Sequence, residues 1–192
     1  HKHYRQLKFI EDNFRNKKIL IEKPLFDKKY DLKIKKNEVF IGFNLRFHPL
    51  ILFLKKKIEN KKIISVNIRC ASYLPNWRKK IDYRKSYSSF KSKGGGVLLD
   101  LSHEIDYLTW LFGDIKSFHK NIDKISNLEI NSEDYAVIIG KTKKNIYFNL
   151  SLNYFSKVNL REILIDGKNF TIKIDMINNT YIKYSSSNLI KK

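Results

Sequence analysis

Hydrophobic and polar positions along the first 49 residues follow first a helical and then a strand-like period. Apolar residues recur on one face between His3 and Asn16, which predicts an amphipathic helix. Short apolar runs at Ile19–Glu22 and Val39–Arg46 predict two buried strands, each ended by a following proline. The polar segment Asp27–Asn37 between them is expected to form a surface helix. Helix, strand, helix and strand in this order indicate an α/β unit with parallel strands.

A different pattern follows Pro49. Residues 50–60 predict an amphipathic helix, residues 62–74 a long strand, and residues 75–93 a polar, aromatic-rich loop of a length that is usually functional. Further strands are expected at 117–126, 134–142, 145–155, 160–167 and 169–175, with hairpin turns at Lys143–Asn145 and Asp166–Gly167. The sequence therefore predicts an α/β (α+β) chain, whose second part has a large open, mostly antiparallel sheet with helices on one face.

The stretch GGGVLLDLSHEIDYLTWLFG, residues 94–113, predicts one helix with two stripes. The apolar stripe faces the core and consists of Leu98, Leu101, Ile105, Leu108 and Phe112. The second stripe consists of Asp100, His103, Tyr107 and Trp110. A carboxylate and an imidazole one turn apart fit either a hydrogen-bonded core histidine or an acid–base site. A phosphate-binding role for Gly94–Gly96 is the weakest interpretation, because neither G-x-G-x-x-G nor a P-loop is present.

Composition narrows the classes of function. The single cysteine, Cys70, excludes a disulfide framework and favours a reducing compartment, which we take to be the cytoplasm. No apolar run is long enough to span a membrane, and no signal peptide is seen. The formal net charge of +20 suggests nucleic acid as a partner, but only seven of the 39 basic residues are arginine and the lysines are spread along the whole chain. Nucleic-acid binding is therefore the less favoured alternative.

Three motifs in order carry a family resemblance. IEKP at 21–24, GFNLRFHP at 42–49 and the GGG helix resemble the glucose–fructose oxidoreductase / inositol dehydrogenase (Gfo/Idh/MocA) family of NAD(P)-dependent oxidoreductases. The resemblance implies that residues 1–49 are the C-terminal part of a Rossmann dinucleotide-binding domain and that residues 50–192 form a substrate and oligomerisation domain. Because the chain starts at His1 in a helical segment, we expect it to be N-terminally truncated, with the glycine-rich loop upstream.

The resemblance also implies roles for single residues. Lys23 looks like the active-site lysine, His103 like the histidine beside the substrate carbinol, and Asp100 like the aspartate of the same helix. Here this aspartate and histidine are three residues apart, where the family commonly spaces them by four. Positions that resemble cofactor-facing ones are Glu22, Lys23, Asn44, Trp77 and Arg78. No metal site is expected, and His48 and His119 are interpreted as structural.

Substrate contacts are expected in the long loop, where Tyr83, Arg84 and Tyr87 could bind sugar hydroxyls or a phosphate. The loop is most similar to members that act on sugars of bacterial surface polysaccharides. We therefore expect NAD or NADP as cofactor, a sugar or sugar-nucleotide substrate, no nucleic-acid or membrane partner, and self-association through the open sheet. The alternative within the family is a non-catalytic member that serves as a binding or oligomerisation module.

Overall fold

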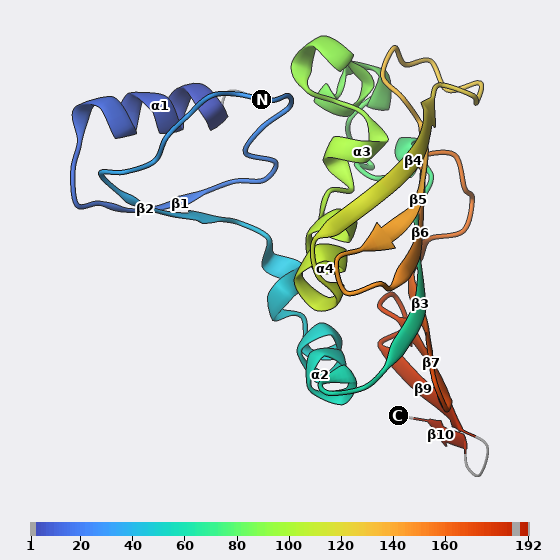
Figure 1. The fold of residues 1–192 in the computed structure, drawn as a ribbon. Coiled ribbons are helices and arrows are strands. Elements are labelled where there is room, and N and C mark those ends of the chain that lie inside the picture. Colours follow the sequence, from blue (N-terminus) through green and yellow to red (C-terminus); the bar gives the residue numbers. More distant parts are fainter. Residues whose placement is uncertain (1–2, 186–188, 192) are drawn as a thin grey trace.

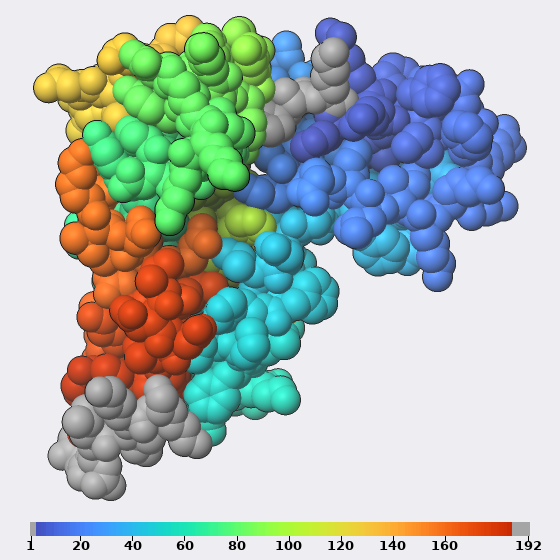
Figure 2. Space-filling model, turned by 180° about the vertical axis from the view of Figure 1, so that it is seen from behind, coloured from blue at the N-terminus to red at the C-terminus, as the bar shows by residue number. Residues whose placement is uncertain are grey.

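The structure, a computed structural model, describes residues 3–185 and 189–191. Its N-terminal unit consists of helix α1 (His3–Asn13) and the parallel strands β1 (Lys18–Ile21) and β2 (Glu38–Ile41). Leu7, Ile21 and Leu25 form a small core between them. This unit projects from the rest of the molecule, as the blue part of Figures 1 and 2 shows. The expected pair of parallel strands is therefore present, in a unit too small to bury both of its faces.

Two expectations for this unit are wrong in detail. Residues 27–37 form no helix, because the buried Glu11 carboxylate accepts hydrogen bonds from the backbone N–H groups of Lys35 and Lys36, both at 2.7 Å, and so fixes an irregular path. The second strand ends at Ile41, and the residues that follow form a 3₁₀ helix, η1 (Asn44–Phe47). His48 then caps helix α2 (Pro49–Ile58) by accepting from the Leu50 N–H at 3.2 Å, so it is structural as expected.

The predicted open sheet is confirmed and contains eight strands in the order β10-β9-β8-β7-β3-β6-β5-β4. Among the described strands of this sheet, only β3 and β6 pair in parallel; every other neighbouring pair is antiparallel. The bounds are β3 (Ile63–Ala71), β4 (Ile115–Asp123), β5 (Tyr135–Thr142), β6 (Tyr147–Asn153), β7 (Leu160–Gly167), β8 (Phe170–Asp175), β9 (Thr180–Ser185) and β10 (Leu189–Lys191). The last two strands were not among those expected. Asp166 and Gly167, expected to form a hairpin turn, belong to β7, and the turn lies two residues later, before β8.

Helices cover one face of this sheet, as expected. Helices α2, α3 (Val97–Asp100) and α4 (His103–Phe112) lie on the same side of it in Figure 1. Alternate residues of the central strands, such as Val66 and Ile68 on β3 and Ile163 on β7, pack with Leu54, Leu108 and Phe112 of the helices into one core. The loop between β3 and α3 is built from four short 3₁₀ turns: η2 (Leu74–Asn76), η3 (Tyr83–Lys85), η4 (Tyr87–Ser89) and η5 (Lys91–Lys93).

The single helix expected for residues 94–113 is divided in two. α3 ends at Asp100 and α4 begins at His103, so Asp100 and His103 lie on different helices and share no common stripe. Tyr107, placed on the polar stripe, is fully buried in the core. The glycines serve the turn and close packing: Gly96 has φ +124°, and a Cβ on Gly95 would lie 2.2 Å from the Tyr87 carbonyl oxygen. Both residues must therefore be glycine for reasons of backbone geometry.

Candidate active site

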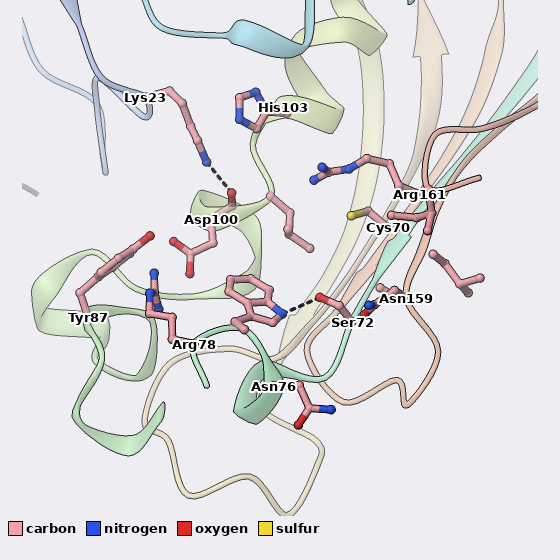
Figure 3. Close-up of a pocket in the computed structure, with 15 residues that line it drawn as sticks. Lys23, Cys70, Ser72, Asn76, Arg78, Tyr87, Asp100, His103, Asn159 and Arg161 are labelled. Atoms are coloured by element: carbon pink, nitrogen blue, oxygen red, sulfur yellow. Dashed lines mark hydrogen bonds between the residues drawn. The ribbon is translucent and has the colours of Figure 1, made fainter. Parts of the chain in front are cut away.

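A pocket of about 610 Å³ lies where the N-terminal unit meets the helices and the sheet. Lys23 reaches it from the end of β1, and His103 reaches it from the start of α4 (Figure 3). The lining residues are Lys23, Cys70, Ala71, Ser72, Asn76, Trp77, Arg78, Tyr87, Asp100, Leu101, His103, Asn159, Leu160, Arg161 and Ile177. Six of the ten site residues expected from the sequence are thus brought together from four separate segments.

Lys23 points across the boundary between the two parts of the molecule. Its ammonium group donates to the backbone carbonyl oxygen of Asp100 at 2.6 Å, and its peptide bond to Pro24 is cis. Burial lowers the pKa of Lys23, and the nearby Asp100 and Glu104 carboxylates act against this shift. The lysine is therefore a fixed donor with a proton that is held less tightly than on an exposed side chain.

His103 is half-buried and packs its ring edge-on against Phe43, with ring centroids 5.8 Å apart. Burial, together with the positive charges of Lys23 and Arg161, lowers the pKa of His103 to about 4. Its Nδ1 atom is buried and has no hydrogen-bond partner among the described residues. At neutral pH the ring is consequently uncharged.

Asp100 does not orient His103. Its carboxylate accepts a hydrogen bond from the buried Tyr154 hydroxyl at 2.5 Å. The break between α3 and α4 separates the two side chains that a continuous helix would have aligned. We therefore assign to Asp100 the positioning of Lys23 through its carbonyl group and the binding of Tyr154.

The long loop forms one wall of the pocket. Trp77 donates from Nε1 to the Ser72 hydroxyl at 2.6 Å and packs edge-on against Tyr154 at 5.1 Å. The Arg78 guanidinium lies over the Tyr87 ring, 5.2 Å from its centroid. These contacts hold an indole, a cation and a phenol at the pocket.

Four expected site residues do not line this pocket. Glu22 and Asn44 are exposed, and Asn44 lies in η1. The Arg84 guanidinium pairs with Asp82 at 3.0 Å and with Glu129 at 3.2 Å, and the Tyr83 hydroxyl accepts from the Glu129 backbone N–H. Tyr83 and Arg84 thus fasten the loop to a neighbouring segment, and neither lines the pocket.

Sequence analysis missed a buried ion pair behind the site. Arg161, on β7, donates from Nε to Glu104 at 2.8 Å, and Glu104 is fully buried on α4. Burial raises the pKa of Glu104 and, to about 12, that of the neighbouring Cys70 thiol, which therefore stays protonated. The available signal was a carboxylate directly after His103 and an arginine at the start of an apolar strand. The packing of α4 on the sheet brings the two together.

The charge state of His103 makes folding stability depend on pH. Because its pKa falls from 6.5 to about 4 on folding, the unfolded chain binds more protons between these values. We expect this contribution to stability to be present above pH 6.5 and to be lost as the pH falls toward 4. Urea unfolding at several pH values should show that the free energy of unfolding falls less steeply with decreasing pH for His103→Asn than for the wild type. His119→Asn, an exposed site on β4, is the control, and an unchanged slope in His103→Asn would contradict the assignment.

Comparisons with known proteins agree with this architecture. A family model described as "Oxidoreductase family, C-terminal alpha/beta domain" matches residues 55–188. A search of curated protein sequences finds no match. Within the residues that the structure describes, no helix is long and apolar enough to cross a membrane.

Several solved structures share the fold. Levoglucosan dehydrogenase, in complex with NADH and levoglucosan, superposes with a TM-score of 0.81 at 19% identity, over 100% of this chain and 58% of the other. UDP-N-acetylglucosamine 3-dehydrogenase GnnA from Acidithiobacillus ferrooxidans superposes with a TM-score of 0.71 at 16% identity, over 100% of this chain and 60% of the other. The WlbA dehydrogenase from Bordetella pertussis, in complex with NADH and UDP-GlcNAcA, superposes with a TM-score of 0.72 at 16% identity, over 90% of this chain and 56% of the other.

The chain therefore spans less than two thirds of the length of each of these three solved chains. At these identities the superpositions show a common fold. The family model, in contrast, covers most of the sequence. The chain belongs to the glucose–fructose oxidoreductase / inositol dehydrogenase family of oxidoreductases.

Proposed function

We propose that this chain is the substrate-binding part of an NAD(P)-dependent oxidoreductase that moves a hydride between a nicotinamide cofactor and a sugar hydroxyl or carbonyl. The observation that carries the proposal is that Lys23 and His103, 80 positions apart in the sequence, line one pocket between the two parts of the molecule. The similar folds of dehydrogenases solved with NADH and a sugar or nucleotide-sugar ligand support it.

The residues suit the oxidation of an alcohol. The hydroxyl proton of the sugar passes to the neutral His103 ring, and the C–H bond breaks with its electron pair leaving as hydride. The Lys23 ammonium donates to the same oxygen and stabilises the negative charge that develops there. In the reverse direction the same lysine polarises the carbonyl group. The nicotinamide, when bound, is the group that takes up or supplies the hydride.

The chain offers part of a cofactor site. Lys23 follows the carboxyl end of β1, the edge at which parallel α/β sheets bind ligands. Trp77 and Arg78 lie in the same pocket and suit the nicotinamide end of a dinucleotide. No G-x-G-x-x-G motif occurs in the 192 residues, so we place the diphosphate-binding loop in a region that precedes His1. Residues 1–49 would then complete a Rossmann domain, in the cytoplasm, and the open sheet face of residues 50–192 would support self-association.

The chain by itself is therefore expected to bind NADH and NADPH weakly. The glycine-rich loop and the helix after it normally supply the diphosphate contacts. Titration of the purified chain with either cofactor, followed by nicotinamide fluorescence, should give no saturation at micromolar concentrations. Saturation in that range would contradict the proposed division into domains.

The proposed function is tested with a protein that joins this chain to its dinucleotide-binding region. Formation of reduced nicotinamide is followed at 340 nm with NAD or NADP and a panel of sugars, sugar acids and nucleotide sugars. Sugar-dependent reduction supports the proposal. Tight cofactor binding without reduction by any sugar would favour the non-catalytic alternative, and salt-dependent binding of DNA would favour the nucleic-acid alternative.

A further inference from the structure

The pocket is lined by more positive than negative charge. Lys23, Arg78 and Arg161 line it, against a single lining carboxylate, that of Asp100. The Asp100 carboxylate is bound by the Tyr154 hydroxyl, which offsets part of its negative charge. A neutral sugar needs hydrogen-bonding groups but no such excess of cations.

Arg161 is the pocket cation that pairs with a fully buried carboxylate. It lies on β7 opposite Cys70 of β3, and its side chain is 25% exposed. Among the described residues, the one oxygen that accepts from its guanidinium is Glu104 Oε1, through Nε. The end of the guanidinium points into the pocket toward Asp100 and His103 in Figure 3. Its terminal amino groups therefore face the space that a ligand would occupy.

A second arginine–carboxylate pair, whose carboxylate lies on the same helix α4, shows the contrast. Arg46 donates to Asp106 from Nε at 2.8 Å and from Nη2 at 2.5 Å, and it also lies over the Trp110 ring. Neither Arg46 nor Asp106 lines the pocket. Arg46 uses its planar face and its fork for internal contacts, whereas Arg161 is held from behind by Glu104 and the Cys70 thiol, and the end of its guanidinium points into the pocket.

We infer that Arg161 binds a compact oxyanion, a carboxylate or a phosphate, carried by the sugar substrate beside the hydroxyl that reacts. Glu104 is the positioning residue that fixes the guanidinium from behind. The inference rests on the proposed function, because that function supplies the reacting hydroxyl beside which the oxyanion is placed. Guanidinium groups bind carboxylates and phosphates through two parallel hydrogen bonds, which would also orient the sugar.

The test measures sugar binding to the chain without cofactor. D-glucuronate, D-glucose 6-phosphate and D-glucose are titrated by ligand-observed NMR into the wild type and into the double variant Arg161→Gln/Glu104→Gln. The double variant removes both charges of the pair, so no unpaired charge stays buried. Arg46→Gln/Asp106→Asn makes the same kind of change in a pair that shares helix α4 but lies outside the pocket, and it is the matched control.

We expect at least one of the two anions to bind the wild type more tightly than glucose does. In the Arg161→Gln/Glu104→Gln variant its affinity should fall about 10- to 100-fold, the effect of a lost charge-assisted contact, while glucose binding stays unchanged. The control should bind all three as the wild type does. If the variant loses affinity for glucuronate alone, the ligand group is a carboxylate. If it loses affinity for glucose 6-phosphate alone, the ligand group is a phosphate.

Three results would overturn the inference: no saturable binding of either anion to the wild type, equal affinity for glucose and both anions, or equal losses in the variant and in the control. Since no cofactor is present, these results are independent of hydride transfer. A protein that reduces NAD with neutral sugars as well as with acidic ones would retain the proposed function and lose this inference.

Discussion

His103→Asn is expected to slow the single-turnover reduction of NAD(P) by a sugar by about 10²- to 10⁴-fold, the contribution of a lost acid–base group. In the proposed function the neutral imidazole accepts the hydroxyl proton, and an amide cannot replace it. Folding should be preserved, because His103 is half-buried and its main packing contact is the edge-on Phe43 ring. Cofactor affinity should change little, since most cofactor contacts are assigned to the region before His1.

Lys23→Met should lower the same rate by a similar factor, because in the proposed function the ammonium group stabilises the charge on the reacting oxygen. Methionine keeps most of the length of the side chain and removes the bond to the Asp100 carbonyl group. Lys55→Met, a lysine on α2 that lies 4.0 Å from the Trp110 ring centroid, is the matched control and should keep the wild-type rate. A wild-type rate in Lys23→Met or His103→Asn would show that the replaced side chain has a structural role.

The second large effect is on stability. Arg161→Met is expected to lower the free energy of unfolding by about 3–5 kcal/mol, because it leaves the fully buried Glu104 carboxylate without its counter-ion. Arg161→Gln/Glu104→Gln should recover most of this loss. Urea unfolding of both variants measures the difference.

Arg46→Met is a useful comparison for this prediction. Its side chain is 38% exposed, and water can solvate part of the Asp106 carboxylate when the partner is removed. We expect a smaller loss for Arg46→Met than for Arg161→Met. Equal stability of Arg161→Met and the wild type would contradict the importance of the buried pair.

The parts of the fold that depend on local pattern were predictable. Alternation of apolar residues gives β5 to β8 nearly to the residue, and the apolar stripe gives α2 and α4. The irregular path of residues 27–37 was not predictable, because it depends on the Glu11 carboxylate from another element. Local pattern cannot register a hydrogen bond that joins residues 24 positions apart.

The site residues likewise divide into those that the local sequence pattern predicts and those that depend on distant contacts. Lys23 and His103 were identified from short motifs, and they line one pocket. The break at Leu101–Ser102, which removes Asp100 from the side of His103, was not visible in a periodic pattern that runs through it. Arg161 was missed because its importance comes from its ion pair with Glu104 of α4, which is 57 positions away in the sequence.

Deuterium transfer tests the central claim most directly. A protein that joins this chain to its dinucleotide-binding region is mixed with NAD or NADP and with glucose or glucuronate that is deuterated at carbon, and the reduced cofactor is analysed by mass after one turnover. The account predicts one deuterium in the reduced cofactor of the wild type, formed much more slowly by His103→Asn and by Lys23→Met. No deuterium in the cofactor, or transfer at the wild-type rate in both variants, would contradict it.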